Sequence, residues 1–148
     1  MNFAAVNLQF RGFEKAEGAY RQALKIRPND YEAELGLALA LRGQIGEHNM
    51  KTQLAQVSAA LERAKSLSPE RPEAYFYDAI LTLEFKARQA ERAAGDPKAA
   101  IPFLQRATKL FQTFVRKAEG NDGYEASIEL AHQRLADIEQ MSKFYSGA

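Results

Sequence analysis

The sequence predicts an all-α protein, an array of helical hairpins that ends in a capping helix. Its 148 residues are rich in Ala, Leu, Glu, Gln, Lys and Arg, which favour helix. Apolar residues recur at steps of three and four, the spacing of one helical face, and no alternating strand pattern competes with them. An internal repeat, the third observation, gives the order of the helices.

The repeat consists of a large apolar residue, an alanine three positions later and an apolar residue after three more. Its copies are Tyr20, Ala23 and Ile26; Leu61, Ala64 and Leu67; and Leu104, Ala107 and Leu110. The alanines follow one another after 41 and 43 residues. Each alanine marks a point where a neighbouring helix can approach closely, so we expect one helical hairpin for each repeat.

Local signals predict where the first four helices begin and end. Gly12 ends a short first helix, and Pro28 and Pro69 end the second and fourth, because proline disfavours helical geometry in the residue before it. Asp30 can cap the third helix. The seven predicted helices cover residues 2–11, 13–27, 31–43, 50–67, 72–94, 97–118 and 123–145.

The last three helices have their own signals. Pro72 lies near the first turn of the fifth, and the run Gly95-Asp96-Pro97 ends this helix and begins the sixth. Gln112 stands where the other repeats have a proline, so the sixth helix is expected to continue. The run Asn121-Asp122-Gly123 predicts a turn into the last amphipathic helix.

These features resemble the tetratricopeptide repeat family, whose repeats are helical hairpins of about 34 residues. The resemblance implies one domain over residues 1–148, a right-handed α-solenoid with repeats at about 1–29, 30–70 and 71–120 and a capping helix at 123–145. The residues that carry the match are Tyr20, Ala23, Pro28, Leu37, Ala38, Leu41, Leu61, Ala64, Pro69, Gly95, Asp96, Ala100, Leu104 and Ala107.

The chain departs from this family pattern in three places. Extra residues form a predicted loop over 42–51 and about two added helical turns over 85–94. Asp78 occupies a position where an apolar residue is usual. Either it lies at the edge of the groove or beside an arginine, or it is a polar anchor inside a binding groove.

Composition argues against several classes of function. The net charge is +1, and the longest basic run is the pair Arg116-Lys117, so no nucleic-acid surface is predicted. The absence of Cys excludes thiol catalysis, cysteine zinc sites and disulfides. No uninterrupted apolar stretch approaches the roughly 18 residues of a membrane span, and no signal-peptide pattern is visible, so no membrane insertion is predicted. The composition resembles that of bacterial family members, and both the cytoplasm and the periplasm or cell envelope are compatible with it.

The sequence has no recognisable catalytic motif. The run Gly43-Gln44-Ile45-Gly46 lacks the Lys-Ser/Thr ending of a phosphate-binding loop. Glu129 and His132 have the spacing of a di-iron helix, but that site needs two such motifs, so we interpret them as a solvated face. We interpret His48 as an exposed loop residue. The prediction is a non-enzymatic protein without metal or cofactor.

The resemblance implies a concave groove that holds a partner peptide or helix. The lysine, asparagine and arginine clamp of chaperone-binding members is absent, so an apolar segment is the expected ligand. The alternative is that the last helix or the long helical extensions fill the groove. The predicted groove residues are Leu35, Leu39, Phe76, Tyr77, Ile80, Leu83 and Leu135.

We therefore predict a scaffold or adaptor that binds another protein. The alternative is a self-associating structural segment of a larger assembly without a separate ligand, and the cell envelope is one compatible place for such an assembly. The first helix presents Phe3, Val6, Leu8 and Phe10, so its outer face is expected to meet further repeats or a second copy in a homo-oligomer.

Overall fold

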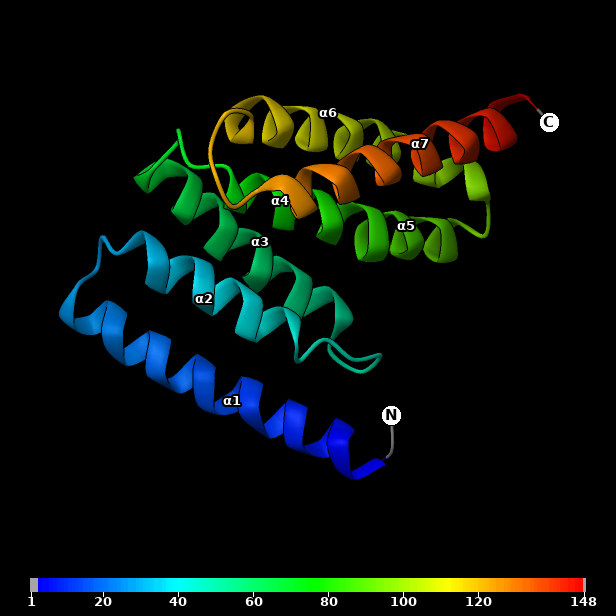
Figure 1. Ribbon diagram of the computed structural model, residues 1–148. Coiled ribbons are helices and arrows are strands. Elements are labelled where there is room, and N and C mark those ends of the chain that lie inside the picture. Colours follow the sequence, from blue (N-terminus) through cyan, green and yellow to red (C-terminus); the bar gives the residue numbers. More distant parts are fainter. Residues whose placement is uncertain (1–2, 148) are drawn as a thin grey trace. The chain divides into compact units, whose positions relative to one another are not determined.

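The computed structural model describes residues 3–147, with side chains from Arg11 onward (Figure 1). All regular structure over these residues is helical, which confirms the all-α class. The elements are α1 (Phe3–Ile26), α2 (Tyr31–Arg42), α3 (Met50–Leu67), α4 (Glu73–Leu81), the π-helical η1 (Thr82–Lys86), α5 (Ala87–Ala94), the 3-10 helix η2 (Pro97–Ala100), α6 (Ile101–Ala118) and α7 (Glu125–Gly147).

The predicted break at Gly12 is wrong, because α1 runs without interruption from Phe3 to Ile26. Glycine inside a helix costs only about 1 kcal/mol relative to alanine. That cost is small beside the packing that a continued helix gains: Phe13 and Tyr20 of α1 both lie against α2. The predicted apolar surface of Phe3, Val6, Leu8 and Phe10 lies outside the described side chains.

The other predicted helix ends are confirmed to within a few residues. Asp30 has extended backbone and its Oδ1 accepts a hydrogen bond from the Ala33 N–H at 3.2 Å, as an N-cap does. Gly95 ends α5 with φ of 66°, a left-handed conformation that suits glycine. Asp96 then caps η2 by accepting from the Lys98 N–H at 3.0 Å. The predicted loop before α3 and the continuation of the sixth helix to Ala118 are also present.

The chain forms two compact units, Met1–Pro69 and Glu70–Ala148. In the first, α2 packs against both α1 and α3 (Figure 1). Its interior includes Leu37, Leu41, Leu54, Val57 and Leu61, all at most 4% exposed. The repeat alanine Ala64 is completely buried, as expected for a close helix crossing.

Helices α1 and α2 approach each other through two glycines. A Cβ atom built on Gly36 would overlap the ring of Tyr20, and one on Gly43 would overlap the ring of Phe13. Gly36 and Gly43 are two helical turns apart, as are the two rings, so antiparallel packing brings both pairs into register. Glycine at these positions provides the space that the aromatic rings occupy.

In the second unit, α6 packs against both α4 and α7. The centre of the core is the completely buried set of Leu104, Ala107 and Phe111 on α6. Elements α4, η1 and α5 follow each other directly, so the predicted extra turns before Gly95 are present. Within this long helix, η1 adds one π-helical segment, in which hydrogen bonds span five residues instead of four.

Candidate functional site

The predicted groove residues of the first unit are only partly available to a ligand. Leu35 is buried, at 8% exposure, and Leu39 is half-buried on the same helix. Gly36, which lies between them, is covered by the ring of Tyr20. Of the two predicted groove residues on α2, Leu39 alone keeps appreciable exposed surface.

In the second unit, the predicted groove residues separate into two kinds. Ile80 and Leu83 belong to the buried core, each at 9% exposure. Phe76 and Leu135 pack against that core and keep part of their surface exposed, as does Tyr77. The core therefore takes up two of the five groove positions in this unit, and sequence periodicity did not distinguish them from the rest.

Phe76 and Tyr77 form an aromatic pair on α4. Their ring centroids are 5.5 Å apart in an edge-to-face arrangement. The Phe76 ring continues inward to Phe114 and Phe111, at centroid distances of 5.0 and 6.2 Å. The inner contacts fix the Phe76 ring, so the outer aromatic surface is held in a defined orientation.

Asp78 lies beside an arginine, the first of the two positions considered for it. It is only 1% exposed, and its Oδ2 is 3.7 Å from a terminal nitrogen of Arg106 on α6. The Thr82 hydroxyl donates to Oδ1 at 3.4 Å. A buried carboxylate needs such partners, because desolvating its charge is costly.

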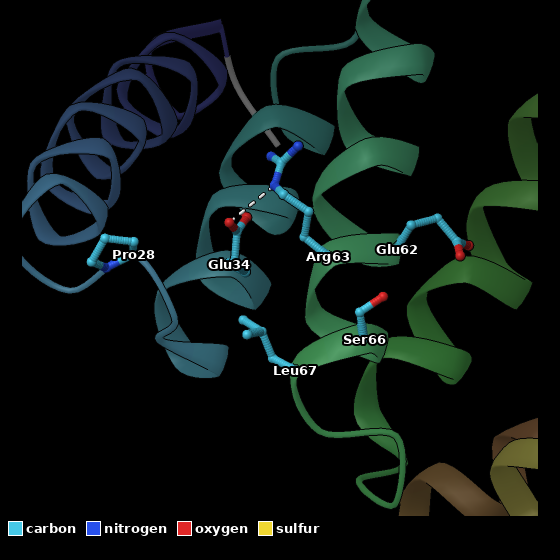
Figure 2. Close-up of a pocket in the computed structure, with 6 residues that line it drawn as sticks. All are labelled: Pro28, Glu34, Glu62, Arg63, Ser66 and Leu67. Atoms are coloured by element: carbon cyan, nitrogen blue, oxygen red, sulfur yellow. Dashed lines mark hydrogen bonds and ion pairs between the residues drawn. The ribbon is translucent and has the colours of Figure 1, made fainter.

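A second buried carboxylate occurs in the first unit. Glu34 on α2 is 5% exposed, and the Nε of Arg63 on α3 donates to its Oε1 at 3.0 Å. Its other oxygen, Oε2, is buried and has no hydrogen-bond partner among the described residues. Figure 2 shows the Glu34 carboxylate turned toward the Arg63 guanidinium.

These two ion pairs share a feature of the sequence repeat. Arg63 immediately precedes Ala64, and Arg106 immediately precedes Ala107. Each arginine therefore has the same place in its repeat, and each contacts a buried acid on an earlier helix: Arg63 contacts Glu34 on α2, and Arg106 contacts Asp78 on α4. The sequence contained this signal, but the two acids do not occupy equivalent positions in the repeats, so periodicity alone did not pair them with the arginines.

The Glu34–Arg63 pair borders an open pocket of about 330 Å³ in the first unit. Its lining comes from the turn after α1, from α2 and from the C-terminal half of α3 (Figure 2). We call it the Glu34 pocket, and its residues are Pro28, Glu34, Glu62, Arg63, Ser66 and Leu67.

A separate polar cluster joins α1 to the start of the α2–α3 loop. Arg21 Nε donates to Glu17 Oε2 at 2.8 Å, and Gln44 Nε2 donates to Glu17 Oε1 at 2.9 Å. The hydrogen bond from Arg21 is the main reason why the pKa of Glu17 lies below its ordinary value of 4.5. This cluster connects elements of one unit, so we assign it a structural role.

Glu129 and His132 are exposed on α7, and His48 is exposed in the loop before α3. Within residues 3–147, no group of three or more His, Asp or Glu side chains is arranged to hold a metal ion. Over the same residues, each helix is too short or too polar to cross a membrane.

Neither protein-family models nor curated proteins give a match to this sequence. The resemblance to tetratricopeptide repeats therefore rests on the residues of this chain alone.

Proposed function

We propose that this chain is a non-enzymatic scaffold or adaptor that binds another protein, and that its hairpins stack as a tetratricopeptide-like solenoid. The observation that carries the proposal is the Phe76–Tyr77 pair, which is anchored from the core and partly exposed. Aromatic side chains with this combination of rigidity and exposure are enriched at protein interfaces.

The repeat supports the same function. Ala64 of the first unit and Ala107 of the second are both completely buried, whereas Ala23 of the first unit is only partly buried. Arrays of such hairpins provide extended binding surfaces. The most suitable partner is an amphipathic helix or an extended apolar segment, because the exposed part of the candidate surface is aromatic.

The test is affinity capture from a native lysate with the whole chain as bait. We expect a partner to be retained by the wild type and lost from Tyr77→Ala. The matched control is Phe144→Ala, which removes an aromatic ring that is 72% exposed on α7, outside the candidate surface. Circular dichroism establishes that each variant is folded. Equal retention by Tyr77→Ala and the wild type would contradict the proposed surface.

The second candidate function is self-association as part of a larger structure. It is favoured by two strongly exposed apolar side chains, Ile26 at 80% and Phe144 at 72%. Sedimentation analysis distinguishes the two functions: self-association requires a mass that rises with protein concentration, and Phe144→Ala or Ile26→Ser should reduce it. A partner-binding adaptor keeps a constant mass in the absence of its partner.

A further inference from the structure

We propose that the Glu34 pocket binds a lysine side chain presented by the protein partner. This inference adds a recognition element to the proposed binding function and rests on it. The pocket lies wholly within the first unit and shares no residue with the Phe76–Tyr77 pair. The two surfaces can therefore be tested separately.

The central group is the Glu34 carboxylate, because one of its two oxygens has no hydrogen-bond donor among the described residues. Arg63 Nε donates a hydrogen bond to Oε1 of Glu34, whereas Oε2 accepts from no donor among the described residues. A buried carboxylate oxygen without a donor is unfavourable, and an N–H group that reaches it forms a charge-assisted hydrogen bond. The missing group is a donor, so the expected ligand is cationic rather than anionic.

Access to Oε2 depends on Arg63. Its side chain is 52% exposed, and only its Nε is held by Glu34. A long, half-exposed arginine can change rotamer at modest cost, which would open the carboxylate to an entering group. We therefore expect ligand binding to displace the Arg63 head from its position in Figure 2.

The walls fit a side chain with an apolar stem and a charged end. Pro28 and Leu67 supply apolar surface, and Ser66 adds a hydroxyl. The second acid of the pocket, Glu62, accepts from Lys65 at 3.0 Å, and its side chain is 59% exposed, so water can solvate its other oxygen. Glu34, which is buried, is therefore the carboxylate that recognises the cation. Lysine matches these features, because its ammonium is a compact triple donor on a flexible four-carbon stem.

The probe is N-acetyl-lysine N-methylamide, titrated into the isotope-labelled whole chain and followed in amide proton–nitrogen correlation spectra. We expect saturable shifts at the amides of Glu34, Ser66 and Leu67. The matched probe is the norleucine analogue, which has the same stem without the ammonium, and we expect it to bind at least about tenfold more weakly. The glutamine analogue tests whether a neutral amide donor is sufficient.

The variants are Glu34→Gln and its matched control Glu32→Gln, which changes an exposed acid of the same helix that does not line the pocket. We expect Glu34→Gln to weaken lysine binding by about tenfold or more, and Glu32→Gln to change it by less than threefold. If Glu34→Gln does not fold, Ser66→Leu replaces it, since this exposed position borders the pocket and a leucine there would fill it.

Three results would overturn the proposal: no shifts at the pocket, equal binding of the lysine and norleucine probes, or tighter binding of the glutamine probe. Its failure is distinguishable from failure of the adaptor function. If partner capture depends on Tyr77 but not on Glu34, the lysine-pocket proposal is refuted and the adaptor function stands. If the lysine probe binds but no partner is captured, the pocket is supported and the adaptor function is refuted.

Discussion

The sharpest structural prediction concerns two glycine-to-alanine substitutions with opposite effects. Gly18 lies within α1, and apart from its chain neighbours and the adjacent backbone of its own helix, no described atom lies within 4 Å of a Cβ placed there. Gly18→Ala should raise the free energy of unfolding by about 1 kcal/mol, because alanine is the better helix former. Gly36 lies within α2, but a Cβ there overlaps the Tyr20 ring.

The magnitude for Gly36→Ala combines two terms. The helix-propensity gain of about 1 kcal/mol is the same as at Gly18. Forcing the Tyr20 ring out of its position costs about 1–3 kcal/mol, the usual range for overpacking. The difference between the two variants isolates the steric term, so Gly36→Ala should be about 1–3 kcal/mol less stable than Gly18→Ala.

The assay is urea unfolding followed by far-ultraviolet circular dichroism. A second pair of variants, Tyr20→Ala with and without Gly36→Ala, provides the control. Without the ring, Gly36→Ala should become stabilising by about 1 kcal/mol. If Gly36→Ala is as stabilising as Gly18→Ala while Tyr20 is present, the proposed contact between the ring and α2 is wrong.

Three further predictions concern the buried acid, the polar cluster and a helix end. Arg106→Met should lower the free energy of unfolding by about 1–3 kcal/mol, because it leaves the Asp78 carboxylate buried without its arginine. Adding Asp78→Leu should restore the stability, because it removes the buried charge. Equal denaturation midpoints for the single and the double variant would argue against the ion pair. The pKa of Glu17 is lowered in the folded chain from an ordinary value of 4.5, so its stabilisation is present above that pH and is lost as the pH falls through the folded-state pKa. Melting temperatures should therefore show Glu17→Gln to be less stable than the wild type at neutral pH, with a gap that closes in acid; a constant gap would mean that its charge has no role. Gly95→Ala should be destabilising by about 1 kcal/mol in urea unfolding despite open space around it, because φ of 66° disfavours alanine, and a gain in stability would contradict this backbone conformation.

The all-α class and most of the helix ends follow from local signals in the sequence. Pro28, Asp30 and Gly95 act through proline geometry, a side-chain cap and a left-handed backbone, and each effect is complete within about one helical turn. Two of the three repeat alanines, Ala64 and Ala107, are completely buried, whereas Ala23 is only partly buried. Such local signals do not require knowledge of which helices are neighbours.

Tertiary structure decided the features that depend on neighbours. Gly12 does not end a helix, because packing of α1 against α2 outweighs a small local preference. Ile80 lies in the core, whereas Tyr77 is half-buried and does not belong to the core cluster, although both are on the apolar face of one helix. The pairing of Arg63 with Glu34 joins residues 29 positions apart, and no local pattern specifies such a contact. Burial and ion pairing are properties of the space between helices, so they become definite only when the helices have packed.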